Sequence, residues 1–216
     1  MWGQMKILAI TDSLGLPRRN ASVSEEDTYL DLLAKEHRVK DLSYGGLTVK
    51  DHRLLSTNVL PYFADGWFDL GIVQLGIVDC APRPFPRCVG RYIPRELAYA
   101  LRPYIQRIYY WQYTPIKAFR FYYFELIKAM RRVCKEVITI PILPARRWTE
   151  KRSPGLSKEI RRYNQIIEDT GCDTVLSCCE AANIDTTLDL HLTKEGHKQI
   201  YYALCIQLAK VKGVVL

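Results

Sequence analysis

The sequence predicts a three-layer α/β/α protein, in which helices cover both faces of a five-stranded parallel sheet. Short apolar runs, each closed by polar or glycine-containing turns, are typical of strands buried on both faces. These runs alternate with longer segments of helical apolar spacing, which implies parallel strands joined by right-handed crossovers. A chain of 216 residues is long enough for one such domain and short for two. We therefore expect a single domain over residues 1–216.

Five segments have the character of strands: 6–10, 37–42, 69–76, 137–140 and 174–176. The first runs directly into a polar turn, residues 11–15, that closes on a glycine. The second ends near the paired glycines Gly45 and Gly46, where the backbone must bend or approach another group closely. The third leads into a proline-stopped turn over residues 77–83. Open α/β sheets place their chemistry at such carboxyl-end turns.

The predicted helices lie between these strands. Ser24 followed by Asp27 predicts a helix start with acidic residues in the first turn. Three further segments have helical spacing: 94–134, with an interruption near Thr114 and Pro115, then 157–169 and 193–210. Residues 141–154 have the composition of a loop.

The formal net charge of +8 is concentrated in one region, residues 83–132, which we call the basic aromatic segment. It holds eleven basic residues against two acidic ones, and thirteen of the 24 aromatic side chains. Such local charge favours an anionic partner, including the surface of an anionic membrane. The alternative is a helix pair whose aromatic rings pack on the sheet while the basic groups face water. No nucleic-acid-binding motif accompanies the charge, so we expect no nucleic-acid partner.

Other classes are disfavoured by what the sequence omits. The first residues show no basic region followed by an apolar run, and no stretch reaches the length of a membrane span, so we expect a cytoplasmic protein. The seven cysteines contain no Cys-x-x-Cys pair, which signals neither a zinc site nor a disulfide framework. We expect no metal and no organic cofactor.

One set of residues has the parts of an acyl-transfer site. Ser13 lies in the turn after the first strand, and Asp189 and His191 precede the last helix. In such sites a histidine removes the serine proton, an aspartate fixes its tautomer, and backbone N–H groups bind the oxyanion. On its own, the Asp12–Ser13 pair has a simpler interpretation as a helix N-cap.

Together these segments resemble the GDSL/SGNH hydrolase family. The similar blocks are residues 11–15, 45–48, 76–79, 163–164 and 189–197, in the family's order, and the match runs from residue 5 to about 205. The resemblance implies a flavodoxin-like fold and a triad of Ser13, His191 and Asp189. It also implies that the N–H groups of Ser13 and Gly46 bind the oxyanion.

Two positions depart from the family pattern. Val78 stands where the family has an asparagine of the oxyanion hole, and a valine side chain donates no hydrogen bond. Losing one such donor typically costs ~2.7–4 kcal/mol of transition-state stabilisation. Arg83 on the same loop is a candidate replacement. Asp189 lies two residues before His191 rather than the usual three, and Leu188 occupies the usual place.

Substrate contacts are predicted for Asp12, Asp79 and Arg83, with Arg83 recognising an acidic part of the substrate. The alternative for both aspartates is a structural one, in which they hold their loops by hydrogen bonds. His197 stands one turn into the last helix, where we expect a cap or surface residue rather than the general base.

The resemblance favours a serine esterase acting on an acyl ester, and we expect this to be an O-acetyl group of an anionic carbohydrate or surface-polysaccharide precursor. A sugar O-acyltransferase would use the same residues. A different alternative, suggested by Val78 and the shifted Asp189, is a binding or assembly protein that keeps the fold without catalysis.

Overall fold

The computed structural model describes residues 4–18, 21–90, 92–94, 96–97, 100–101, 104–105 and 111–211. Its centre is a five-stranded sheet in the order β2-β1-β3-β4-β5, with every neighbouring pair parallel. The strands are β1 (Lys6–Thr11), β2 (Arg38–Asp41), β3 (Phe68–Gln74), β4 (Cys134–Thr139) and β5 (Asp173–Thr174). The order is that of flavodoxin-like folds, so the predicted fold class is confirmed.

The two faces of the sheet belong to separate hydrophobic cores. Along β1, Ile7 and Ala9 face one core, while Leu8 and Ile10 face the other, as the two-residue period of a strand requires. All four side chains are almost fully buried. A central parallel strand covered on both sides therefore needs the continuous apolar run that its sequence shows.

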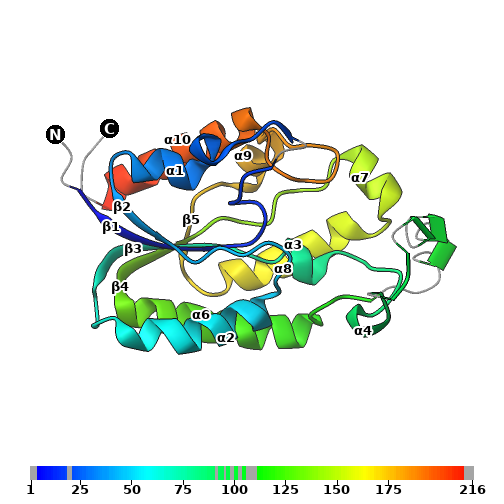
Figure 1. Ribbon diagram of the computed structural model, residues 1–216, viewed down its shortest axis with the longest axis horizontal. Helices are drawn as coiled ribbons and strands as arrows, with labels where there is room; N and C mark the ends of the chain where they lie inside the picture. The colour runs from blue at the N-terminus through cyan, green and yellow to red at the C-terminus, as the bar shows by residue number, and fades with distance from the viewer. Residues whose placement is uncertain are drawn as a thin grey trace.

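Helices form the outer layers (Figure 1). One face carries α1 (Tyr29–Ala34), α9 (Cys178–Asn183) and α10 (Lys194–Val211), and the other carries α2 (Val49–Val59), α6 (Ile116–Val133) and α8 (Leu156–Glu168). Shorter helices follow two strands and one loop: α3 (Ile77–Cys80), α4 (Arg87–Gly90) and α7 (Arg147–Arg152). Turns of 3-10 helix cover Glu25–Asp27 and Leu60–Tyr62. No helix in the described ranges combines the length and the apolar character of a membrane span.

One helix start and two whole helices differ from the sequence-based expectation. Ser24 and Asp27 form a capping box on a short 3-10 turn, and α1 begins only at Tyr29, after its own N-cap Thr28. The expected loop over 141–154 contains α7. Helix α2 was not expected at all. Its first N–H group, that of Val49, donates to the carboxylate of Asp79. Local sequence patterns do not reveal this partner, because it lies thirty residues away.

The basic aromatic segment is divided between packing and exposure. Phe119 and Tyr123 of α6 are fully buried in the core, as the packing alternative expects. Tyr92, Tyr104 and Phe121 are largely exposed. The rest of the predicted helix over 94–110 falls partly outside the described residues, as do these aromatic and basic members of the segment: Arg91, Arg95, Tyr99, Arg102, Arg107, Tyr109 and Tyr110.

Candidate active site

Ser13 is held in a tight turn at the carboxyl end of β1. The N–H of Leu14 donates to Oδ1 of Asp12 at 2.9 Å, and the N–H of Gly15 donates to the backbone oxygen of Asp12 at 3.2 Å. A Cβ atom on Gly15 would lie only 2.1 Å from Oγ1 of Thr11, so glycine is required for the turn to close. The turn presents the Ser13 hydroxyl to a cavity rather than to the core.

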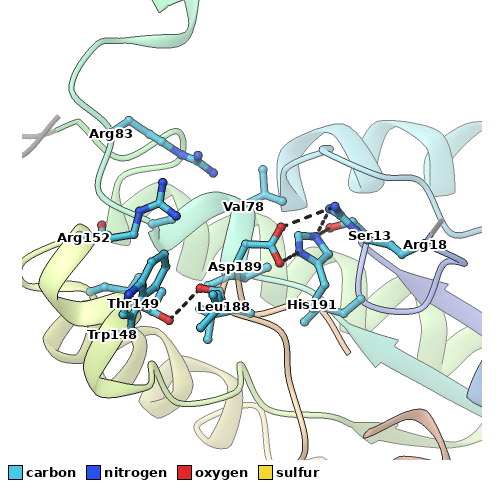
Figure 2. Close-up of a pocket in the computed structure, with 16 residues that line it drawn as sticks. Ser13, Arg18, Val78, Arg83, Trp148, Thr149, Arg152, Leu188, Asp189 and His191 are labelled. Carbon is cyan, nitrogen blue, oxygen red and sulfur yellow. Dashed lines mark hydrogen bonds and ion pairs between the residues drawn. The ribbon is translucent and has the colours of Figure 1, made fainter. Parts of the chain in front are cut away.

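His191 reaches Ser13 from the loop that precedes α10. The backbone N–H of His191 donates to Oγ1 of Thr187 at 3.1 Å. The backbone oxygen of His191 accepts from the backbone N–H of Thr187 at 2.7 Å. The intervening Leu190 has φ +69°, an unusual value for a residue with a side chain. This closed loop places Nε2 of His191 3.1 Å from Oγ of Ser13 (Figure 2).

Asp189 lies on the other side of the imidazole. Its Oδ1 is 3.1 Å from Nδ1 of His191, within ion-pair distance but without the alignment of a hydrogen bond. The Thr187 hydroxyl donates to the same oxygen. Although partial burial raises the pKa of Asp189, this hydrogen bond and the nearby charges of His191 and Arg18 bring it below its ordinary value. Hydroxyl, imidazole and carboxylate thus stand in the order that acyl transfer requires.

Arg18 is a member of this cluster that sequence reasoning missed. One guanidinium nitrogen contacts Nε2 of His191, and the other lies 3.7 Å from Oδ2 of Asp189 (Figure 2). A backbone bridge to Val23 fixes the arginine in place. Burial, and then the charge of Arg18, lower the pKa of His191, which Asp189 opposes. Nothing in the polar loop after Ser13 distinguishes this arginine from a solvent-exposed one, so no local signal was available.

The three residues open into a cavity of about 410 Å³, a size suited to a small ligand. Its charged and polar walls include Ser13, Arg18, Arg83, Arg152, Asp189 and His191, and its apolar walls include Val78, Trp148, Leu156, Leu188 and Leu190. Of these, the predicted Ser13, Asp189, His191 and Arg83 come together as expected, and Arg152 is an addition. Arg152 stands on α7, in the segment that the sequence analysis expected to be a loop.

The expected oxyanion donors are only partly assembled. Val78 lines the cavity and offers no hydrogen-bond donor from its side chain. Gly45 lies next to Ser13, since a Cβ atom built on it would be 3.7 Å from Cβ of Ser13. Gly46 was expected to supply the second backbone donor. It has φ +76°, and a Cβ atom built on it would have no other atom within 4 Å. Gly45 is thus the glycine that lies against Ser13, and the assignment of the oxyanion donor to Gly46 stays a prediction.

Asp12 and Asp79 do not line the cavity, which corrects their assignment to substrate binding. Both are buried, with relative exposures of 1% and 0%. Burial raises the pKa of each carboxyl to about 7, against the hydrogen bonds from Leu14 to Asp12 and from Thr114 and Val49 to Asp79. Their bonds hold the turn after β1 and the start of α2, so their role is the structural alternative.

His197 was expected at a cap or on the surface rather than as the general base. The surface position is wrong, but the side chain caps the first residue of α1 and lies outside the cavity. It is buried between α10 and α1, and its Nδ1 accepts from the N–H of Tyr29 at 3.3 Å. The Tyr-Asn pair of the fourth block is also structural. Asn164 bonds both backbone groups of Ile142, which ties α8 to the segment after β4. Tyr163 donates to the backbone oxygen of Thr114. The described residues contain no group of three or more side chains placed to hold a metal ion.

Several solved structures that are similar to this chain in fold are named as esterases or lipolytic proteins. An esterase EstA from Pseudoalteromonas sp. is 16% identical, with a TM-score of 0.59 over 97% of this chain and 100% of its own. The acetylxylan esterase Axe2 from Geobacillus stearothermophilus is 14% identical, with a TM-score of 0.60 over 98% of this chain and 95% of its own. A member of the lipolytic protein G-D-S-L family from Veillonella parvula is 12% identical, with a TM-score of 0.57 over 94% and 97%.

The chain therefore has the fold of the GDSL/SGNH hydrolases, and the resemblance in its motifs is confirmed at the level of architecture. No protein-family model matches the sequence, and no curated protein matches it either. At 12–16% identity the likeness is carried by the three-dimensional arrangement rather than by the sequence.

Proposed function

We propose that this protein is a serine esterase of the SGNH type that hydrolyses a small acyl ester. The observation that carries the proposal is the contact between Ser13 and His191, residues 178 positions apart in sequence, in a cavity that also contains Asp189. A hydroxyl within hydrogen-bond distance of an imidazole, in a cavity at the carboxyl edge of a parallel sheet, is the geometry expected of a nucleophile and its base.

The surroundings of His191 indicate how its protons are arranged. A hydroxyl and a guanidinium group stand at Nε2, and a carboxylate stands at Nδ1, which favours the neutral tautomer with its proton on Nδ1. In this tautomer Nε2 accepts the proton of Ser13 as Oγ attacks the ester carbonyl. The resulting imidazolium then protonates the leaving alcohol. In the second step His191 takes a proton from the attacking water molecule and returns it to Oγ of Ser13 as the acyl-enzyme is hydrolysed.

Arg18 and Val78 both predict a slow enzyme. Because Arg18 occupies Nε2 beside Ser13, its guanidinium group has to move aside before the proton can be transferred. The oxyanion is bound by the N–H of Ser13 and a glycine N–H of the turn at 45–46, without a side-chain amide from position 78. Each missing donor of this kind lowers the rate by roughly 10²–10³-fold.

For the substrate we propose an O-acetyl ester of an anionic carbohydrate, handled in the cytoplasm. The cavity of about 410 Å³ suits an acetyl group with one sugar-sized unit, and Trp148 adds an aromatic side chain to its lining. Axe2, with the same fold, is an acetylxylan esterase. A transferase would differ in admitting a sugar hydroxyl in place of water. Contact of the basic aromatic segment with an anionic membrane stays a prediction, tested by sedimentation with anionic vesicles at low salt.

The test is hydrolysis of 4-nitrophenyl acetate by the parent protein and by Ser13→Ala and His191→Ala. We expect the parent to release nitrophenolate above background and both variants to lose at least about 100-fold of that rate. His197→Gln is the matched control, because this buried histidine lies outside the cavity. Equal rates for the parent and Ser13→Ala would refute the esterase and favour the non-catalytic alternative.

A further inference from the structure

The cavity has an excess of positive charge that the triad does not use. Among the residues that the structure describes, three arginines line it, Arg18, Arg83 and Arg152, against a single lining carboxylate, that of Asp189. Asp189 is already shared between His191 and Arg18. A cavity that loses water when a ligand enters must compensate such charge, and an anionic ligand group does so directly.

Arg83 is held in place to receive such a group. Its backbone N–H and oxygen form a bridge with Trp111, at 2.8 and 2.9 Å. Its guanidinium carbon lies 5.0 Å from the centre of the Tyr113 ring, a cation–π contact that fixes the plane of the group. Its Nε is buried and has no hydrogen-bond partner. A buried donor without a partner is costly, and a ligand oxygen would satisfy it.

Arg152 approaches the same space from another element. It ends α7, and its guanidinium carbon lies 4.5 Å from the centre of the Trp148 ring. Figure 2 shows the Arg83 and Arg152 side chains directed into the cavity on the side away from Ser13 and His191. The planar N–H donors of a guanidinium group match the oxygens of a carboxylate or phosphate.

We propose that Arg83 and Arg152 form an oxyanion-binding subsite that selects esters carrying a carboxylate or phosphate on the alcohol part. The proposal rests on the proposed esterase function, since it takes Ser13 as the position of the ester carbonyl. With acetyl as the acyl group, the anion has to belong to the alcohol, because acetyl carries no charge. The subsite thus separates charged acetyl esters from neutral ones such as unsubstituted acetylated sugars.

The test measures binding in the Ser13→Ala background, so that its outcome does not depend on hydrolysis. The probes are 4-acetoxybenzoate, 4-acetoxyphenyl phosphate and the neutral methyl 4-acetoxybenzoate, titrated by calorimetry. We expect at least one anionic ester to bind ten-fold or more tightly than the neutral one, and this preference to shrink as salt is added. The better of the two anions identifies carboxylate or phosphate as the preferred group.

Arg83→Gln and Arg152→Gln, each in the Ser13→Ala background, should each weaken binding of the preferred anionic ester at least ten-fold. Arg147→Gln is the matched control, because this exposed arginine also stands on α7 but does not line the cavity. Equal binding of neutral and anionic esters, or a loss as large in Arg147→Gln, would overturn the subsite. If Arg83→Gln does not fold, Arg152→Gln alone decides. Arginine-dependent binding in a parent that hydrolyses no ester would overturn the proposed function but keep the subsite.

Discussion

Val78 provides the most direct test of how this site stabilises charge, through the substitution Val78→Asn. The valine lines the cavity and is 8% exposed, so an amide placed there is close to the reacting atoms and little solvated. Arg83, the candidate replacement, lies on the side of the cavity away from Ser13 (Figure 2), and Arg18 is engaged with His191 and Asp189. The introduced amide would therefore add a donor that the site lacks.

The expected gain follows from the strength of one oxyanion donor. Such a donor contributes about 2.7–4 kcal/mol to transition-state stabilisation, which corresponds to an increase in kcat of roughly 10²–10³-fold. The substitution also has a cost in folding. Removing two buried methyl groups lowers the free energy of unfolding by about 2 kcal/mol, and an amide without a partner lowers it by roughly 1–3 kcal/mol more.

The assay is steady-state hydrolysis of 4-nitrophenyl acetate, at a temperature where circular dichroism shows parent and variant fully folded. Val78→Ala serves as the control, because it opens the same space without adding a donor. We expect Val78→Asn to exceed the parent in kcat, and Val78→Ala to remain near it. If Val78→Asn matches Val78→Ala, another group already binds the oxyanion and our description of the site is wrong.

Three further predictions concern charge. Asp189→Asn should lower kcat by about 10–100-fold. This loss is smaller than the ~10⁴-fold loss for a buried, aligned carboxylate, because Asp189 is half-exposed and poorly aligned with His191. A 10⁴-fold loss in steady-state kinetics would contradict this prediction. Arg18→Gln should move the acid limb of the kcat/KM profile to higher pH, because Arg18 lowers the pKa of His191; an unmoved limb counts against the contact. Burial raises the pKa of Asp12 from 3.8 to about 7, so the folded chain keeps a proton that the unfolded chain releases, and stability falls as the pH rises from about 4 to 7. Asp12→Asn should remove up to about 4 kcal/mol of that fall, seen in urea unfolding at pH 4 and 8. An identical pH dependence in parent and variant would contradict the shift.

The sequence predicted the strands well because each is a buried apolar run with a clear polar end. All five predicted strands are present, and the turn at Ser13 and the loop at His191 meet as the order of the motifs implied. These features depend on short stretches of chain, and a parallel sheet brings the carboxyl ends of its strands to one edge.

The features that were missed depend on tertiary contacts. Helix α2 begins where Asp79 bonds the N–H of Val49, and Asp79 was assigned to the substrate because its buried position is invisible in the sequence. Arg18 looks like any arginine in a polar loop until the fold brings it to His191. Gly45 and Gly46 are adjacent, so no pattern could decide which of them lies against Ser13.

The short edge strands of the sheet affect how copies of this chain can associate in concentrated solution. Sheet margins with long rows of unpaired backbone groups can template a strand from another molecule. Here one margin, β5, spans only Asp173–Thr174, and the other, β2, is short and carries charged, mostly exposed side chains. Both edges therefore disfavour the addition of a strand from another molecule.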